Sequence, residues 1–320
     1  MQQQSHSDAA PVLVIGATGR HGGTGATVVD RLLRRGRPVR AMVRTDDDRA
    51  AELRGRGAAT VVADLHDRAS LVAAVDGVSA IYFTYPVAAG VIPAAANLAS
   101  VLREADSPIH LVVMSMAVSS VDSPSRLGQA QAVAEEVFVW AGLRPTVLRF
   151  GGLFHENVLL LHGASIRADA LIANSFGQAA APWIGGDDAA EVAVAHLSAP
   201  PPASAQISYP PPAEALSHAE VAGIISAETG RDVRYEHISA ASWRSELETA
   251  AEADPTSPIN SSMAQHISTL GAVLSKRGPL VAPDPHGLTV VLNRPPTPLA
   301  DFVRQNLSHF AALPVARSAT

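Results

Sequence analysis

The chain has 320 residues, of which 47% are hydrophobic and 17% charged, and its formal net charge is −6 at pH 7. This length suits one large domain or a core domain with a smaller companion, and the acidic balance argues against tight nonspecific binding of nucleic acid. The sequence contains no cysteine, which excludes disulfides, thiolate nucleophiles and cysteine-ligated metal sites.

The N-terminal residues 1–10 are polar and lack the basic and apolar stretches of a signal peptide, so we expect a flexible leader. No uninterrupted apolar run approaches the roughly 18 residues that are needed to cross a bilayer. We therefore expect a cytoplasmic protein that has no membrane partner.

Residues 11–150 alternate short β-branched runs with longer helical patterns. Such alternation is typical of βαβ units, and it predicts an α/β fold with a doubly wound parallel Rossmann sheet. We expect six strands, at 11–15, 38–43, 59–63, 80–83, 109–114 and 145–150. The first helix is expected to be rich in Val28, Val29, Leu32 and Leu33 and to end near Gly36. Further helices are expected at 49–54, from a cap at Asp67 to 75, at 93–105 and at 125–141.

The pattern changes after residue 150. We expect residues 151–312 to form mostly a smaller C-terminal α/β substrate subdomain, with some return to the core, and 313–320 to be a flexible tail. Ser217 and Glu220 have the spacing of a capping box. Helices are expected at 187–197 (capped by Asp187 or Asp188), 217–230, 241–250 and 299–310, with a strand at 234–238 and loops at 199–203 and 251–257.

A glycine-rich turn connects the first strand to the first helix. In such a turn, backbone N–H groups and the helix N-terminus can face a pyrophosphate. Glycines recur every three residues, at Gly16, Gly19, Gly22 and Gly25, so two overlapping motifs exist. The first motif, Gly16, Gly19 and Gly22, starts at the end of the strand. The second motif makes Gly25 the glycine that lets helix and strand pack closely. Both interpretations are partly correct if the turn is three residues longer than usual. The residues expected at the pyrophosphate are Gly16, Thr18, Gly19, Arg20, His21 and Gly22.

The residue after the second strand indicates which nucleotide is bound. A carboxylate there would accept hydrogen bonds from the ribose hydroxyls of NAD, but this chain has Arg44. A guanidinium suits the 2′-phosphate of NADP(H), and Arg20 could add a second positive group. The alternative is a solvated surface arginine, which the acidic run 46–48 slightly favours. We therefore expect NADP(H) to be preferred over NAD(H).

Residues after the later strands should also face the nucleotide, because ligands lie beyond the carboxyl ends of parallel strands. Asp64 and Leu65 follow the third strand, where a residue can hydrogen-bond the adenine amino group; a plain turn is the alternative. Thr84 and Tyr85 follow the fourth strand, and we expect them under the nicotinamide ribose.

Several segments resemble the NmrA-like family of atypical short-chain dehydrogenases, and together they span roughly residues 11–312. They are VIGATG at 14–19, VRAMVR at 39–44, AEEVFVWAGL at 134–143, TVLRF at 146–150, FHEN at 154–157, DAA at 188–190, EVA at 220–222, TGRDVRY at 229–235 and NRPPTPLADF at 293–302. The resemblance implies an NAD(P)-binding Rossmann domain with a small C-terminal α/β subdomain over the cofactor cleft. Members of the family include quinone- and azo-reducing enzymes, metabolite reductases and regulators that bind the nucleotide without turnover.

Short-chain dehydrogenases usually protonate or deprotonate the substrate oxygen with a tyrosine whose pKa is lowered by a lysine four residues further on. This chain cannot form that pair, because its single lysine is Lys276 and no tyrosine stands four residues before it. By the spacing of the family, the lysine position holds Gln131, which can hydrogen-bond a ribose hydroxyl but supplies no charge. Hydride transfer to a quinone needs less from the protein, since the cofactor carries the chemistry.

Candidate catalytic residues follow the fifth and sixth strands. We expect His155, Glu156 and Asn157 to face the substrate side of the nicotinamide. His155 is the candidate proton donor by its position, and a structural or ribose-side role is the alternative. His155 and Asn157 are also the candidate substrate-binding residues. Ser115, at the end of the fifth strand, could bond the substrate or the nicotinamide amide, or could only cap a turn.

The remaining histidines are scattered, and no dense cluster of histidines and carboxylates predicts a metal site. His162 and His266 could line the cleft, and Trp140 and Trp243 are expected to pack between helices. These features favour an NADP(H)-dependent reductase of a quinone-like or other electron-poor small metabolite. Two alternatives remain open: a non-catalytic redox-sensing regulator with a protein partner, and a non-redox metabolite-tailoring enzyme on the same fold.

Overall fold

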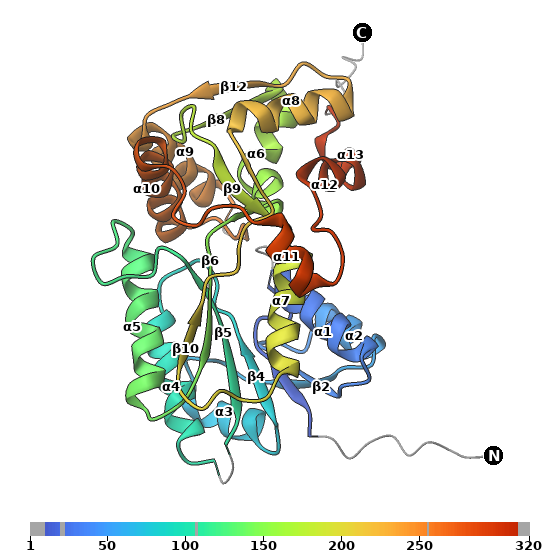
Figure 1. Cartoon of the computed structure of the whole chain (residues 1–320), viewed down its shortest axis with the longest axis vertical. Coiled ribbons are helices and arrows are strands. Elements are labelled where there is room, and N and C mark those ends of the chain that lie inside the picture. The colour runs from blue at the N-terminus through green and yellow to red at the C-terminus, as the bar shows by residue number, and fades with distance from the viewer. Residues whose placement is uncertain (1–9, 20–22, 106–107, 255, 313–320) are drawn as a thin grey trace, which may run out of the picture.

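The computed structural model describes residues 10–19, 23–105, 108–254 and 256–312. Its lower half in Figure 1 is built around a seven-stranded sheet with the order β10-β6-β5-β4-β1-β2-β3, in which all neighbouring strands are parallel. The strands are β1 Val12–Val14, β2 Val39–Val43, β3 Ala59–Val62, β4 Ala80–Phe83, β5 His110–Met116, β6 Thr146–Phe150 and β10 Gln206–Ser208. The predicted doubly wound Rossmann sheet is confirmed.

The seventh strand, β10, was not predicted from the sequence. It has three residues, and its central Ile207 is 53% exposed, so it carries neither the length nor the burial of a core strand. Pairing with β6 along the sheet edge is what makes it a strand. Such a contact between distant segments leaves little local signal.

Helices cover both faces of the sheet. One face packs against α1 Thr24–Arg34, α2 Asp48–Gly55 and α7 Gly186–Ser198, and the other against α3 Arg68–Val75, α4 Val91–Leu102 and α5 Arg126–Trp140. Asp67 caps α3 as predicted, since its carboxylate accepts a hydrogen bond from the backbone N–H of Ala69. Ser125 caps α5 in the same way, through the N–H of Gly128.

The predicted carboxylate cap of α7 is wrong. The helix begins after Gly185, and no side chain caps it. Asp188 is instead fully buried, and its two oxygens accept hydrogen bonds from Arg294 (2.5 Å) and from the backbone N–H of Thr297 (2.7 Å). The carboxylate therefore anchors a distant C-terminal segment to the Rossmann domain.

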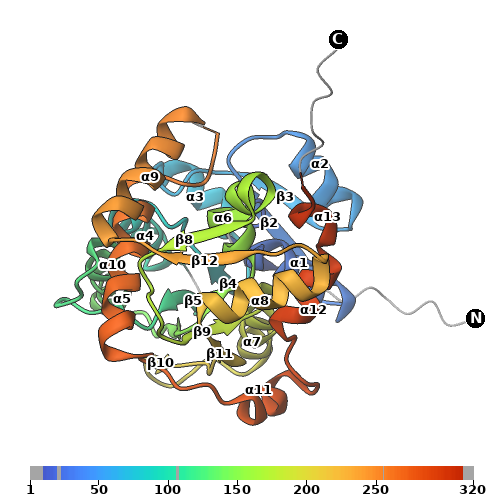
Figure 2. The same cartoon turned by 90° about the horizontal axis from the view of Figure 1, so that it is seen from above.

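The upper unit in Figure 1 is smaller and combines helices with two short sheets, which Figure 2 shows from above. The β-strands are β7 Leu153–Phe154, β8 Leu171–Asn174, β9 Ala181–Ile184, β11 Glu214–Leu216 and β12 Arg234–His237. The helices are α6 Glu156–Asp169, α8 His218–Thr229, α9 Ala240–Ala253, α10 Ser261–Arg277, α11 Pro285–Leu292, α12 Leu299–Gln305 and α13 Leu307–Phe310. The predicted capping box of Ser217 and Glu220 is present at α8.

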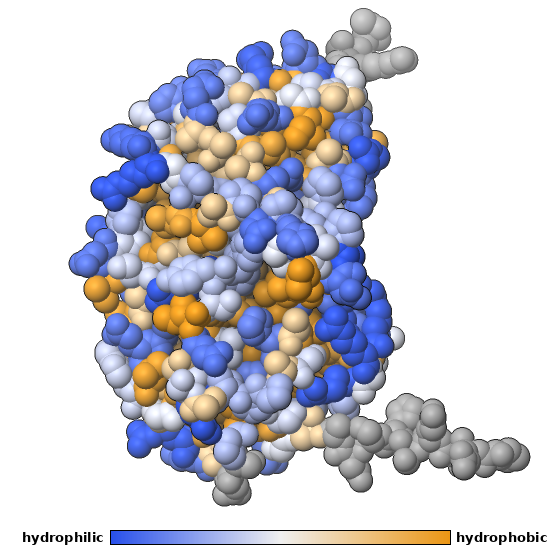
Figure 3. Space-filling view, viewed as in Figure 1, coloured by the Kyte–Doolittle hydropathy of each residue, from blue (hydrophilic) through white to orange (hydrophobic). Residues whose placement is uncertain are grey.

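Several predicted boundaries in this unit are wrong. Helix α9 extends to Ala253, into the segment expected to be a loop, and the expected last helix is broken at Asn306 into α12 and α13. Helices α6, α10 and α11 were not predicted. Figure 3 shows hydrophobic patches on this face of the molecule near α11, where Val290 is 71% exposed.

The two tryptophans expected to pack between helices differ in their surroundings. Trp243 is buried as predicted, and its indole stacks on the His162 ring with 5.9 Å between centroids. Trp140 is 70% exposed, so that prediction is wrong. It is the last residue of α5 and lies on the outer face, away from the sheet that buries Phe138. Among the described residues, no helix is long and apolar enough to span a bilayer.

Candidate active site

A cavity of about 700 Å³ lies at the carboxyl ends of the parallel strands, between the Rossmann sheet and the C-terminal unit. Such crevices are where doubly wound sheets bind their ligands. One wall is formed by residues that follow the strands: Ile15, Gly16, Thr18, Gly19, Arg44, Thr45, Asp64, Leu65, Thr84, Tyr85 and Ser115. Every predicted nucleotide-binding residue that the structure describes lines this cavity; Arg20, His21 and Gly22 lie outside the described residues.

The glycine turn brings helix α1 into direct contact with the end of β1. Gly16 has φ +82°, a conformation that favours glycine, and a Cβ there would lie 2.4 Å from the Thr84 methyl group. A Cβ on Gly25 would lie 2.2 Å from the carbonyl oxygen of Gly16. Gly25 is therefore the close-packing glycine of the second motif, whereas Gly16 starts the turn at the strand end, as the first motif requires.

Arg44 is exposed and lines the cavity, and two of its acidic neighbours bind other arginines. Asp47 caps α2 and binds Arg49 at 2.6 Å, which holds the pKa of the Asp47 carboxyl below its usual value. Asp46 binds Arg54 at 2.7 Å. Two of the three carboxylates in the acidic run 46–48 are thus paired with other arginines, and one of these arginines, Arg49, also lies on the cavity wall.

A polar corner follows β3 and β4. Tyr85 Oη lies 2.8 Å from Nε2 of His66 and donates to the carbonyl oxygen of Ala89 at 3.2 Å. Burial raises the pKa of Tyr85, and the nearby Asp64 carboxylate raises it further while Arg44 opposes this. The Tyr85 phenol consequently stays protonated, so it can act as a hydrogen-bond donor but not as a base.

Two buried amide side chains of the cavity lining each have a polar atom without a described partner. They are Gln131 on α5 and Asn157 on α6, each 7% exposed. Gln131 Nε2 and Asn157 Oδ1 make no hydrogen bond among the described residues. A buried amide left unpaired costs about 1–3 kcal/mol, which a ligand with complementary groups would offset. Gln131 is suited to a ribose hydroxyl, and Asn157 to a polar group of the ligand.

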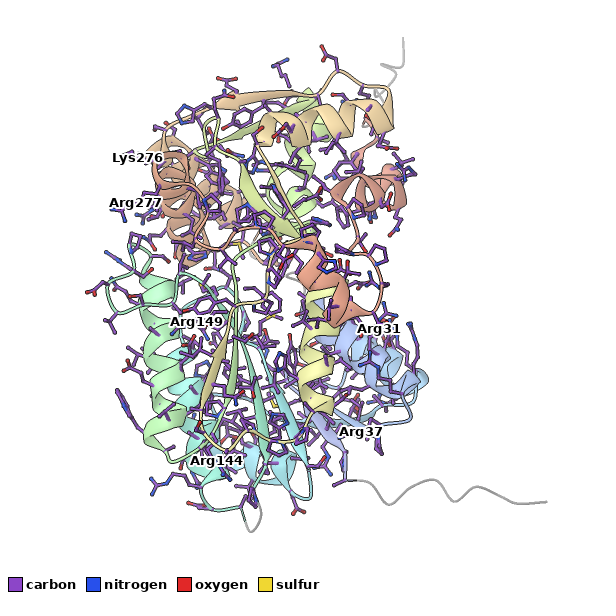
Figure 4. All side chains as sticks on the ribbon, in the orientation of Figure 1. Arg31, Arg37, Arg144, Arg149, Lys276 and Arg277 are labelled. Atoms are coloured by element: carbon purple, nitrogen blue, oxygen red, sulfur yellow. The ribbon has the colours of Figure 1, made fainter. Side chains whose placement is uncertain are left out.

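The Ser115 hydroxyl is part of a buried network. It donates to Glu135 and lies 3.0 Å from the Ser119 hydroxyl. The other oxygen of Glu135 binds Arg149 through two N–H groups, at 2.5 and 3.0 Å. Arg149 also donates to the Tyr209 hydroxyl at the surface, and Figure 4 shows it on the Rossmann half. Ser115 reaches the cavity, but its hydroxyl proton is bound to Glu135.

The expectation that His155 faces the substrate is wrong. Its ring is fully buried and is not part of the cavity wall. It packs on Phe302, and Nε2 lies 3.6 Å from a carboxylate oxygen of Glu214. Glu156 likewise turns away, and its carboxylate accepts the backbone N–H of Gly186 at 3.2 Å. The β7 pairing turns the chain after β6, so that Asn157 faces the cavity and His155 does not.

The second wall of the cavity is mainly apolar and comes from β7, α6, α10 and the segment after α10. Its hydrophobic residues are Leu153, Phe154, Leu161, Met263, Ile267, Leu270, Val273, Leu274 and Leu280. His266 is the polar exception on α10, and its Nδ1 lies 2.6 Å from the Ser125 hydroxyl. His162, the other histidine considered for the cleft, is buried in the C-terminal core instead.

The α10 wall was missed from the sequence, although a signal was present. Met263, Ile267, Leu270 and Leu274 recur at helical spacing and are buried on one face of α10. The single lysine, Lys276, is exposed near the end of the same helix, in the C-terminal unit (Figure 4). Among the described residues, no group of three or more histidines and carboxylates could hold a metal ion.

The NmrA-like family model matches residues 8–130 of this chain. An NAD(P)H azoreductase from Xenophilus azovorans is 30% identical over 312 residues, which cover 94% of this chain and 99% of the azoreductase. The chain belongs to the NmrA-like family. An uncharacterised oxidoreductase of Bacillus subtilis, YesF, is 32% identical over 76% of this chain and 78% of its own.

Other members of the fold have been solved. The structure of an NADPH-dependent quinone oxidoreductase from Escherichia coli complexed with NADPH superposes with a TM-score of 0.76 at 21% identity. It covers 92% of this NmrA-like chain and 99% of the oxidoreductase. A Citrobacter triphenylmethane reductase complexed with NADP(H) has the same TM-score, identity and coverage. At this identity, both likenesses establish the fold alone.

Proposed function

We propose that this NmrA-like protein is an NADP(H)-dependent reductase of planar, electron-poor aromatic acceptors such as quinones or azo compounds. The observation that carries the proposal is the composition of one cavity. Its sheet-side wall has the groups that a dinucleotide needs, and its other wall is lined by apolar side chains from α6 and α10. A cofactor and an apolar acceptor can therefore lie face to face in one cavity.

The cofactor assignment rests on the strand-end residues. The turn at Gly16 and Gly19 presents backbone at the start of α1, where an anion is favoured by the helix N-terminus. Arg44 supports the 2′-phosphate form, because Asp46 and Asp47 bind other arginines. Gln131 supports a ribose contact, because its amide nitrogen is buried without a described partner.

The acceptor class follows from the apolar wall and from the missing tyrosine–lysine pair. Bound NADPH supplies a hydride, and the protein has to hold the acceptor close and exclude water. Leu270 and Leu274 of α10 and Leu161 of α6 provide a dry surface for an aromatic ring. The named activity of the azoreductase relative belongs to the same class of acceptor.

The direct test mixes the purified full-length protein with NADPH and a panel of benzoquinones, naphthoquinones and azo dyes, and follows absorbance of the reduced nicotinamide. Acceptor-dependent oxidation of NADPH is the expected result. Tight NADPH binding without oxidation by any acceptor would instead indicate a redox-sensing regulator. A cofactor that is required but not consumed would indicate non-redox chemistry.

A further inference from the structure

Helix α10 is joined to the N-terminus of α5 by side-chain hydrogen bonds beside the cavity. The His266 ring lies with Nδ1 2.6 Å from the Ser125 hydroxyl, which caps α5. Beside it, Gln265 accepts the backbone N–H of Arg126 at 3.2 Å and donates to the carbonyl oxygen of Pro124 at 3.4 Å. His266 is 8% exposed and lines the cavity, so these hydrogen bonds hold its imidazole at the apolar wall of the cavity.

These contacts hold the start of α5, the segment in which typical short-chain dehydrogenases would carry the catalytic tyrosine. With Gln131 in the lysine position, the tyrosine position four residues earlier is Leu127, which is buried and has no proton to give. Ser125 stands two residues before Leu127. His266 of α10 therefore contacts the same part of the chain as the tyrosine position, through Ser125. It places an imidazole at the cavity from α10 instead of from α5.

We propose that His266 is the proton donor for the reduced acceptor and that Ser125 is its positioning residue. The proposal rests on the proposed reductase function. Other polar side chains of the cavity are less suited to this role. The Ser115 proton is bound to Glu135, and burial raises the pKa of Tyr85. The Asn157 amide does not titrate, and the other imidazole of the cavity wall, His66, has its Nε2 engaged by the Tyr85 hydroxyl.

With a neutral acceptor, the reduction consumes one hydride and one proton. The acceptor gains a hydride from the dihydronicotinamide, which is oxidised, and its reduced oxygen or nitrogen acquires negative charge as the double bond opens. The Nε2–H bond of the His266 imidazolium breaks, and an O–H or N–H bond forms on the acceptor. The neutral imidazole then regains a proton from solvent.

Ser125 can support both protonation states of the ring. A hydroxyl has one donor hydrogen and two acceptor lone pairs, and one lone pair accepts the N–H of Gly128. The hydroxyl can donate to Nδ1 of the neutral ring, and the second lone pair can accept Nδ1–H of the imidazolium. The ring thus keeps its orientation while it loses and regains the Nε2 proton.

The charge of the acceptor provides a sharp test. A quinone needs a proton when it takes up a hydride, whereas a cationic triarylmethane dye becomes neutral on hydride addition and needs none. In His266→Gln we expect kcat with a benzoquinone to fall about 100-fold and kcat with a cationic dye to change less than about threefold. The ratio of the two rates does not depend on how much of the variant is folded. An equal fall with both acceptors would overturn the proton-donor role.

His155→Gln is the matched control, because it removes a buried histidine that does not line the cavity. The ratio of the quinone and dye rates should stay at the wild-type value in this variant. If wild-type protein oxidises NADPH with neither acceptor, the reductase function itself fails. If it reduces both and the ratio in His266→Gln is unchanged, only the assignment of His266 fails.

The pH profile tests the same step without the dye. Wild-type kcat for the quinone should fall with rising pH because the proton donor is lost, and this limb of the profile should be missing in His266→Gln. Ser125→Ala should shift the midpoint of the limb, which a purely structural contact would not do. A limb that persists unchanged in His266→Gln would overturn the proposal.

A measurement on cofactor-free protein completes the test. Histidine NMR signals are followed during addition of 4-nitrophenol, and the His266 signal is assigned by its loss in His266→Gln. A ring that contacts an aromatic oxygen ligand should show a shift on addition. No shift of the His266 signal at saturating 4-nitrophenol, with other cavity signals moving, would contradict contact between His266 and the acceptor.

Discussion

Gly25 and Gly16 are in direct backbone contact, so that a methyl group at Gly25 would lie 2.2 Å from the Gly16 carbonyl oxygen. This contact seats the first turn of α1 on the end of β1 and sets the height of the helix N-terminus above the cavity. The nucleotide site therefore depends on a position nine residues beyond the point where the glycine turn starts.

Gly25→Ala tests this contact. We expect it to destabilise the fold by about 1–3 kcal/mol, because backbone atoms must move to admit the methyl group. NADPH affinity should fall by more than about 10-fold, because α1 is displaced from the pyrophosphate. Denaturant unfolding and fluorescence titration with NADPH measure the two effects. Gly223→Ala in α8 is the control: nothing lies within 4 Å of its added Cβ, so it should stabilise by about 0.5–1 kcal/mol.

Arg44→Ala tests the cofactor preference. We expect the Kd for NADPH to rise about 10-fold, because a charge-assisted contact to the 2′-phosphate is lost, while the Kd for NADH changes little. Isothermal titration with both nucleotides makes the comparison. Arg34→Ala removes the same charge at the far end of α1, outside the cavity, and should leave both affinities near wild type. Equal weakening of NADPH and NADH by Arg44→Ala would refute the 2′-phosphate contact.

Glu135→Gln tests the buried network behind Ser115. Removing this carboxylate leaves Arg149, whose side chain is 16% exposed, without its ionic partner. We expect a loss of about 2 kcal/mol in the free energy of unfolding, below the roughly 3–5 kcal/mol of a fully buried pair, because Arg149 keeps some solvent and the Tyr209 hydroxyl. The exposed pair Arg244–Glu248 serves for comparison, and Arg244→Gln should cost less than about 0.5 kcal/mol.

The buried histidines of the C-terminal unit predict acid lability. Burial lowers the pKa of His162 to about 4, and burial together with His162 lowers the pKa of His218 well below its usual value. Below about pH 6.5 the unfolded chain protonates these rings while the folded chain keeps them neutral. The unfolded state then binds more protons, so stability falls as pH falls from 6.5 toward 4.

Urea unfolding at pH 7 and pH 5 measures this effect. His162 alone should account for roughly 2 kcal/mol of the difference between the two values. His162→Gln is expected to lose stability at pH 7, where the stacking on Trp243 is disturbed, yet to show a smaller fall between pH 7 and pH 5. The idea fails if wild type and His162→Gln lose the same amount on acidification.

Much of the cofactor half could be predicted because its signals are local. A residue that directly follows a buried parallel strand must lie at the carboxyl edge of the sheet, whatever the rest of the chain does. Arg44, Asp64 and Thr84 accordingly line the cavity where their strands end. The same reasoning failed for His155, because the chain after β6 forms the extra strand β7 and turns its residues by pairing with β9.

The sequence by itself determined the Rossmann domain, the glycine turn and the absence of a tyrosine–lysine pair, since these depend on short-range pattern and on counting. Tertiary structure decided the substrate side. Ser125 and His266 are 141 positions apart, and only the packing of α10 against α5 brings them within 2.6 Å. Contacts of that kind depend on how whole elements pack together. Hydrophobic residues at helical spacing indicate that one face of a helix is buried, but they do not indicate which element covers it.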